Sequence, residues 1–136
     1  MSRADEIEDL PDIDGDRPPR LTREIIGHDT AFDAFTQARS QGRLHHSWLL
    51  SGIKGIGKAS FAYQLSRHLL HDTPVDTPVQ NVIEGDSPAV QLIESGTHPD
   101  LFVLSRSYNR DTDKFRTDIP IDDVRRMKSF FQLTSV

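Results

Sequence analysis

A short glycine-rich segment that ends in lysine holds the residue types best suited to chemistry. Gly52, Gly57 and Lys58 have the spacing of a phosphate-binding loop, in which a glycine is followed after four residues by glycine and lysine. Glycines let the backbone turn so that several N–H groups face phosphate oxygens, and a helix that starts at the lysine adds its positive dipole end. The segment predicts a site for the phosphates of ATP or ADP, with Lys58 reaching the β- and γ-phosphates.

The loop departs from the usual pattern immediately after the lysine. Ala59 stands where a serine or threonine hydroxyl would ligate magnesium, and Ser60 lies about 100° farther round the helix. We therefore expect weak magnesium binding and poor hydrolysis, with no catalytic residue in this chain. The alternative is an active ATPase or kinase in which Ser60 or water replaces the missing ligand. The predicted nucleotide-binding residues of the loop are Gly52, Ile53, Lys54, Gly55, Ile56, Gly57, Lys58, Ala59 and Ser60.

Apolar periodicity predicts the elements that must position this loop. Helices are expected over residues 30–41, with Asp29 or Thr30 as the cap, and over residues 58–71. The apolar run at residues 46–51 predicts a strand buried on both faces. Strand, glycine-rich turn and helix then follow one another, which is the setting that a phosphate loop requires.

The second half of the chain continues the alternation of helices and strands. Its expected elements are a loop or linker at 72–88, a helix at 89–95 capped by Ser87, a strand at 100–105, a loop or hairpin tip at 106–117, and an amphipathic helix after Asp122 or Asp123. Alternating strands and helices predict an α/β fold, a parallel sheet with flanking helices. Two strands are too few to cover helices on both faces, so we expect a truncated form of that fold.

Composition narrows the class of protein. The chain has 136 residues, which suits one domain or part of one, and it contains no cysteine, which excludes disulfides and thiolate zinc sites. No apolar run approaches the roughly 18 residues of a membrane span, and no secretory signal is recognisable, so a cytoplasmic location is expected.

Charge is concentrated at the N-terminus. Residues 1–20 contain seven acidic and three basic side chains, and the whole chain has a net charge of −5. We interpret residues 1–20 as a disordered acidic tail, or alternatively as an acidic docking arm. Residues 21–136 are nearly neutral, so contact with DNA is expected only through partners or a local patch.

Histidines and arginines outside the loop receive simpler interpretations. His68 and His71 are expected on a solvated helix face, and His45 with His46 in packing at the entry to the strand, because no third metal ligand is suggested. Arg125, Arg126 and Lys128 are expected to form a solvated basic face.

Several segments together resemble a known family. They are Ile26-Gly-His28, Gly42-Arg-Leu-His-His-Ser-Trp-Leu-Leu-Ser-Gly52, Gly55-Ile-Gly-Lys58, Ser95-Gly-Thr-His-Pro-Asp100 and Ile119-Pro-Ile-Asp-Asp-Val-Arg-Arg-Met127. Over about residues 20–136 the chain is similar to the N-terminal part of bacterial clamp-loader subunits within the AAA+ ATPases. The last two segments are the most specific and resemble the delta-prime branch of that family.

The resemblance implies a role within a replication complex. Residues 21–136 would be a partial AAA+ nucleotide-binding domain of a stator-type subunit of the DNA polymerase III holoenzyme, with little hydrolysis of its own. Its partners would be the delta and gamma or tau subunits and, through the complex, the sliding clamp and primer-template DNA. Gly27 and His28 would lie at the adenine pocket, although a simple turn glycine followed by a polar residue is the alternative. The family's zinc module is not implied, because residues 72–95 contain no cysteine.

Two further implications stay open. The basic residues Arg125, Arg126 and Lys128 would lie towards DNA or a neighbouring subunit if the family's arrangement applies. A regulatory or transposition-type AAA+ protein that shares the same core is a third possible identity.

Overall fold

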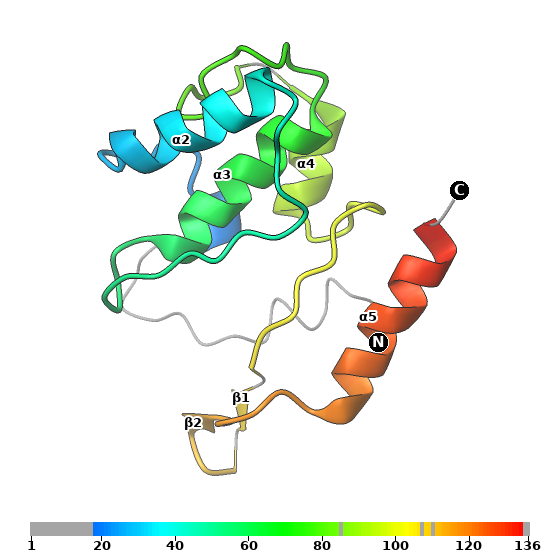
Figure 1. The fold of residues 1–136 in the computed structure, drawn as a ribbon. Helices are drawn as coiled ribbons and strands as arrows, with labels where there is room; N and C mark the ends of the chain where they lie inside the picture. Colours follow the sequence, from blue (N-terminus) through cyan, green and yellow to red (C-terminus); the bar gives the residue numbers. More distant parts are fainter. Residues whose placement is uncertain (1–17, 85, 107, 110, 135–136) are drawn as a thin grey trace.

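The computed structural model describes residues 18–84, 86–106, 108–109 and 111–134. The chain is mainly helical in this part, and two short strands form a hairpin (Figure 1). In chain order the elements are η1 (Pro19–Leu21), α2 (Asp29–Ser40), α3 (Lys58–Leu70), α4 (Pro88–Glu94), β1 (Tyr108–Asn109), β2 (Lys114–Phe115) and α5 (Ile121–Thr134). The predicted acidic tail lies, up to residue 17, outside the described residues, and η1 spans the predicted boundary at residue 20.

The predicted helices are confirmed, and their ends follow local rules. Lys58 is the first residue of α3, as expected from the loop pattern. The Ser87 hydroxyl accepts a hydrogen bond of 3.4 Å from the Val90 N–H at the start of α4, which is the predicted cap. The start of α2 differs, because His28, in a left-handed conformation, is the cap in place of Asp29 or Thr30.

An aromatic core joins α2 to α3. Phe32 and Phe35 of α2 are buried, and the Phe32 ring stacks on Phe61 of α3 with a centroid distance of 4.3 Å. Leu65 and Val79 complete the buried cluster. Each such side chain contributes about 1.5–3 kcal/mol on burial, so this contact dominates the packing between the two helices.

The segment after α3 is docked on that helix, although the sequence predicts a loop or linker there. The Gln64 side-chain amide donates hydrogen bonds to the Val79 carbonyl at 3.0 Å and the Asn81 carbonyl at 2.9 Å. His68 Nε2 lies 2.8 Å from the same Asn81 carbonyl oxygen, to which it donates. The prediction of a solvated face is therefore wrong for His68, which is 1% exposed. The apolar pattern cannot show that a distant backbone supplies acceptors for a buried imidazole.

A buried arginine ties the N-terminal segment to α3. Arg67 is 2% exposed, and its guanidinium donates to the Arg20 carbonyl at 2.6 Å and the Thr22 carbonyl at 3.1 Å. Burial lowers the pKa of Arg67, and the nearby Glu94 carboxylate partly offsets this effect. Glu94 itself forms a bidentate ion pair with Arg23, in which two guanidinium nitrogens donate to the two carboxylate oxygens at 2.5 and 2.9 Å. This ion pair lowers the pKa of Glu94 and links the same segment to α4.

The predicted parallel sheet is not confirmed, because neither apolar run forms a strand in the described residues. Trp48 and Leu49 are 41% and 92% exposed, and only Leu50 of this run packs partly buried against the core, so the expected burial of residues 46–51 on both faces is wrong. His45 and His46 are exposed as well. A central parallel strand needs a hydrogen-bonded neighbour on each edge and cover on both faces. No described segment pairs with this run or with residues 100–105.

Of the two interpretations of residues 106–117, a loop or a hairpin tip, the described residues show the hairpin. β1 and β2 pair antiparallel, with Tyr108 opposite Phe115 and Asn109 opposite Lys114. The turn between them contains Asp113 at a φ of 53°, a left-handed conformation that short polar side chains tolerate. In the described residues, β1 and β2 together form a two-stranded sheet, and no other sheet is present.

Helix α5 stands apart from the other helices, as Figure 1 shows. Ile121, Phe131 and Leu133 are 63%, 62% and 83% exposed, and the Phe130 ring meets Phe102 with a centroid distance of 5.4 Å. No helix among the described residues is long and apolar enough to cross a bilayer.

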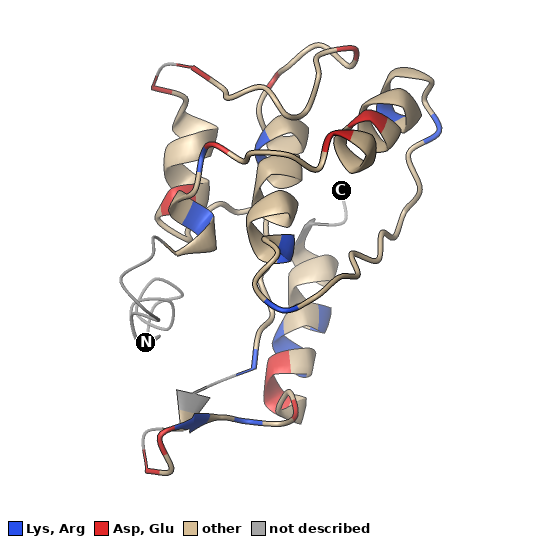
Figure 2. Cartoon of the chain, turned by 90° about the vertical axis from the view of Figure 1, so that its left-hand side faces the viewer, with Lys and Arg blue, Asp and Glu red and all other residues tan. Residues whose placement is uncertain are grey.

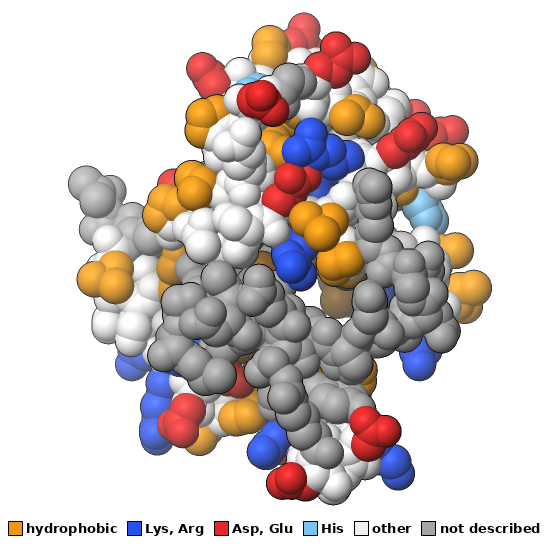
Figure 3. Space-filling view, turned by 180° about the vertical axis from the view of Figure 1, so that it is seen from behind, with side chains coloured by type: hydrophobic (Ala, Val, Ile, Leu, Met, Phe, Trp, Pro, Cys, Tyr) orange, Lys and Arg blue, Asp and Glu red, His pale blue; other side chains and the backbone are white. Residues whose placement is uncertain are grey.

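Charged side chains gather in the first half of α5. Acidic and basic residues lie close together along its first turns (Figure 2), where Arg125 pairs with Asp122 at 3.2 Å and Arg126 with Asp123 at 3.7 Å. Arg125, Arg126 and Lys128 are all exposed in the single chain, as both interpretations of this basic group require. Seen from behind, the coloured side chains mix apolar, acidic and basic types (Figure 3).

Candidate nucleotide-binding site

The predicted loop folds as a tight turn between residues 51 and 58. Gly55 and Gly57 have φ values of 83° and 98°, which side chains other than glycine rarely adopt. Gly52 is needed for a different reason, because a Cβ there would lie 3.2 Å from the Ile56 side chain. The spacing of these glycines is thus explained by backbone conformation and close approach.

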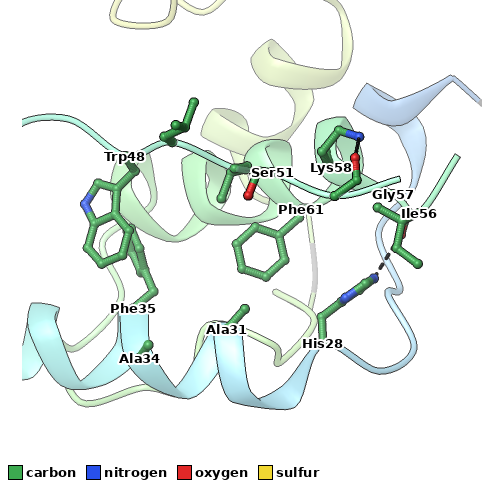
Figure 4. A pocket seen from close by; sticks show the side chains of 13 residues that line it. His28, Ala31, Ala34, Phe35, Trp48, Ser51, Ile56, Gly57, Lys58 and Phe61 are labelled. Carbon is green, nitrogen blue, oxygen red and sulfur yellow. Dashed lines mark hydrogen bonds between the residues drawn. The ribbon is translucent and has the colours of Figure 1, made fainter. Parts of the chain in front are cut away.

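The lysine of the motif folds back over the loop. Lys58 Nζ donates hydrogen bonds to the Gly52 carbonyl at 2.7 Å and to the Ile53 carbonyl at 3.0 Å. Figure 4 shows its ammonium group above the loop backbone. Phosphate oxygens are stronger acceptors for an ammonium group than neutral carbonyls, so this arrangement places the cation where it can exchange partners.

The start of α3 supplies backbone donors beside the lysine. The first intrahelical bond is the 2.9 Å bond from the Phe61 N–H to the Gly57 carbonyl. The N–H groups of residues 58–60 therefore precede the helical ladder, and no side chain caps them in the described structure. Unpaired N–H groups and the helix dipole together favour an anion at this end of α3.

An apolar cavity of about 340 Å³ adjoins the loop. It lies between α2, residues 48–52 and the start of α3, as Figure 4 shows. Phe35, Trp48 and Phe61 give it aromatic walls, while His28 and Lys58 lie along its polar edge. A cavity of this size and composition suits a flat organic ring next to a charged group.

The structure gathers some of the predicted site residues around this cavity and leaves others outside it. His28, Gly52, Ile56, Gly57 and Lys58 line it. Those that do not are Gly27, Ile53, Lys54, Gly55, Ala59 and Ser60. Gly27 still shapes the site, because its φ of 82° and the left-handed His28 form the turn that leads into α2.

The aromatic walls were missed at the level of the sequence. Phe35 and Phe61 carry the helical period of core residues, and Trp48 lies in a run typical of a buried strand. Trp48 and Phe61 flank the glycine-rich loop in the sequence, which is their only signal, whereas Phe35 lies on the preceding helix and has none.

The donor set does not fit a magnesium site at the usual position. Ala59 is exposed and offers a methyl group where an oxygen ligand is required. Among the described residues no group of three or more histidine, aspartate or glutamate side chains could hold a metal ion.

Comparison with known proteins identifies the family. A family model described as DNA polymerase III, delta subunit, matches residues 27–136. The chain belongs to this family. Together with the delta' relatives named next, this match confirms the resemblance to the delta-prime branch of the clamp-loader subunits.

Three relatives illustrate the similarity. The DNA polymerase III subunit delta' of Pseudomonas aeruginosa strain PAO1 is 31% identical over 101 residues, covering 74% of this chain and 28% of that protein. The delta' subunit of Escherichia coli K12 is 31% identical over 81 residues, covering 60% and 23%. The tau subunit of Escherichia coli K12 is 30% identical over 97 residues, covering 69% and 14%.

These shares show how far the similarity extends. The chain spans about a quarter of the length of the two delta' relatives. No solved structure matches it.

Proposed function

We propose that this chain is the nucleotide-binding portion of a stator-type clamp-loader subunit that binds ATP or ADP and hydrolyses it slowly or not at all. The observation that carries the proposal is the loop itself, in which Lys58 lies over a glycine turn at the start of α3 while Ala59 replaces the magnesium-binding hydroxyl. Family membership supplies the replication context.

The site offers separate contacts for the two halves of a nucleotide. Lys58 and the N–H groups at the start of α3 would bind the phosphates by charge-assisted hydrogen bonds. The cavity bounded by Phe35, Trp48 and Phe61 would take the base by stacking. Binding without turnover follows, because the missing oxygen at residue 59 weakens the hold on the metal that neutralises charge during phosphoryl transfer.

The proposed partners are other clamp-loader subunits. Relatives carry the names delta', gamma and tau, and we infer that the whole protein assembles with delta and with gamma or tau. Contact with the sliding clamp and primer-template DNA would then be indirect. The near neutrality of residues 21–136 agrees with that assignment, because it provides no strong field for a polyanion.

Nucleotide binding and turnover test the proposal directly. Titration with a fluorescent ADP should show binding that Lys58→Ala weakens about tenfold or more, the loss of a hydrogen bond to a charged group. Steady-state hydrolysis should stay near background. Ala59→Thr should tighten magnesium-dependent ATP binding and leave metal-free ADP binding unchanged.

Two results would contradict the proposal. Magnesium-dependent turnover in the unaltered chain that disappears in Lys58→Ala would favour the active ATPase, in which Ser60 or water holds the metal. Failure of the whole protein to co-purify with delta and with gamma or tau would remove the clamp-loader assignment.

A further inference from the structure

His28 occupies an unusual backbone position at the edge of the candidate site. Its φ of 59° is one of two positive values for residues other than glycine in the described chain. Left-handed backbone is uncommon for such residues, and histidine, asparagine and aspartate are the types that tolerate it best. His28 is the residue directly before α2, and the turn through Gly27 and His28 directs its imidazole towards the glycine-rich loop (Figure 4).

The imidazole makes two contacts that fix its orientation. Nε2 donates a hydrogen bond of 2.9 Å to the Ile56 carbonyl, which assigns the ring proton to that nitrogen. The ring also meets Phe61 edge-on, with a centroid distance of 6.3 Å and an interplanar angle of 87°. Phe61 is anchored in turn by its stacking on Phe32, so the core between α2 and α3 supports the imidazole.

The bond to Ile56 determines how the next peptide unit is oriented. In a trans peptide the C=O and the following N–H point to opposite sides. A carbonyl of Ile56 held towards His28 therefore directs the Gly57 N–H away from His28, and this N–H has no acceptor among the described residues. Within the loop, the bond from the Ile56 N–H to the Ile53 carbonyl is long at 3.3 Å. Of the two hydrogen bonds that restrain Ile56, the bond from His28 Nε2 to its carbonyl is therefore the shorter.

We propose that His28 is a positioning residue for phosphate binding, which acts by holding the Ile56–Gly57 peptide so that the Gly57 N–H stays available to a phosphate oxygen. The inference rests on the proposed nucleotide site. It differs from a base-contact role for His28, because the group it affects is the triphosphate or diphosphate and not the adenine.

Separate ligands for the two halves of the nucleotide test this inference. Calorimetric titrations of the 136-residue chain with tripolyphosphate, adenosine and ADP would be compared for the unaltered protein, His28→Asn and His28→Gln. Asparagine tolerates the left-handed backbone but is too short to reach Ile56, whereas glutamine restores an N–H donor at greater reach. His46→Asn, at an exposed histidine, is the matched control.

The expected pattern is specific to phosphate. His28→Asn should weaken tripolyphosphate and ADP binding about three- to tenfold, the usual effect of one neutral hydrogen bond, and leave adenosine binding unchanged. His28→Gln should recover most of the loss, and His46→Asn should change nothing. Long-range nitrogen–proton NMR of the free chain should find the His28 proton on Nε2.

Three results would overturn the inference. A loss confined to adenosine would make His28 a base contact. Unchanged tripolyphosphate binding in His28→Asn, while Lys58→Ala weakens it, would remove the inference and leave the proposed function standing. If the unaltered chain binds neither tripolyphosphate nor ADP, the proposed function fails and this inference fails with it.

Discussion

Two regions of the molecule contain similar amphipathic helices but differ in whether the apolar face is buried. The first is the unit of α2, α3 and α4, and the second is the region of α5. In the first unit Phe32, Phe61 and Leu65 are buried at the contact between two helices. In the second, α5 leaves Phe131 and Leu133 exposed. An amphipathic pattern creates an apolar face, but a second surface must meet that face before it is buried.

Polar groups show the same contrast. Arg67 and His68 are buried on α3 because carbonyl groups of distant segments accept their protons. The arginines of α5 pair with acids three residues earlier on the same helix and stay exposed. Long-range partners therefore decide whether a polar residue becomes part of the interior or part of the surface.

The largest expected difference between the two regions is in the cost of removing a phenylalanine. Phe32→Ala should lower the free energy of unfolding by about 3–5 kcal/mol, because the ring is fully buried and its removal leaves a cavity. Phe131→Ala should change it by less than about 0.5 kcal/mol, as an exposed substitution does. Urea unfolding followed by circular dichroism measures both. Similar losses in the two variants would show that α5 is packed as firmly as α2.

A second comparison separates buried from exposed arginine. Arg67→Ala should cost about 2–4 kcal/mol, because the carbonyls of Arg20 and Thr22 lose their donors inside the protein. Arg125→Ala on α5 should cost less than about 0.5 kcal/mol, the range of an exposed pair on one helix. The same unfolding experiment measures the two variants. A small effect at Arg67 would mean that the N-terminal segment is not held by this contact.

The smallest expected effect is a dependence on pH. Burial lowers the pKa of His68 below its ordinary value of 6.5, so the unfolded chain binds a proton more readily than the folded chain. As far as His68 is concerned, the free energy of unfolding keeps its full value above pH 6.5. It decreases as the pH falls further, by at most about 1.4 kcal/mol per pH unit. Melting temperatures between pH 7.5 and 5.5 should therefore fall, and His68→Gln should flatten the slope.

His46→Gln provides the control for that measurement, because His46 is exposed. The pKa of Glu94 is lowered from 4.5, so its own titration lies below the range tested. An unchanged slope in His68→Gln would show that another group causes the dependence.

Local features of the sequence predicted much of the secondary structure and the glycine turn before α3. Ser87 and Pro88 specified the start of α4, and the spacing of Gly52, Gly57 and Lys58 specified a turn followed by a helix. Each of these depends on residues within one or two turns of each other. The same local rules could not find Trp48 as part of the cavity wall, or the bond from His28 to the Ile56 carbonyl.

The sequence by itself determined where helices form, where the backbone must be glycine and that residue 59, directly after the lysine, has no side-chain oxygen. Only the tertiary structure decided that His68 is buried, that Leu49 is exposed and that His28 meets the loop. Caps, turns and periodicity act between neighbours in the chain, whereas burial and hydrogen-bond partners depend on segments far apart in sequence. A run such as residues 46–51 has the composition of a buried strand, yet it becomes one only when other strands lie beside it.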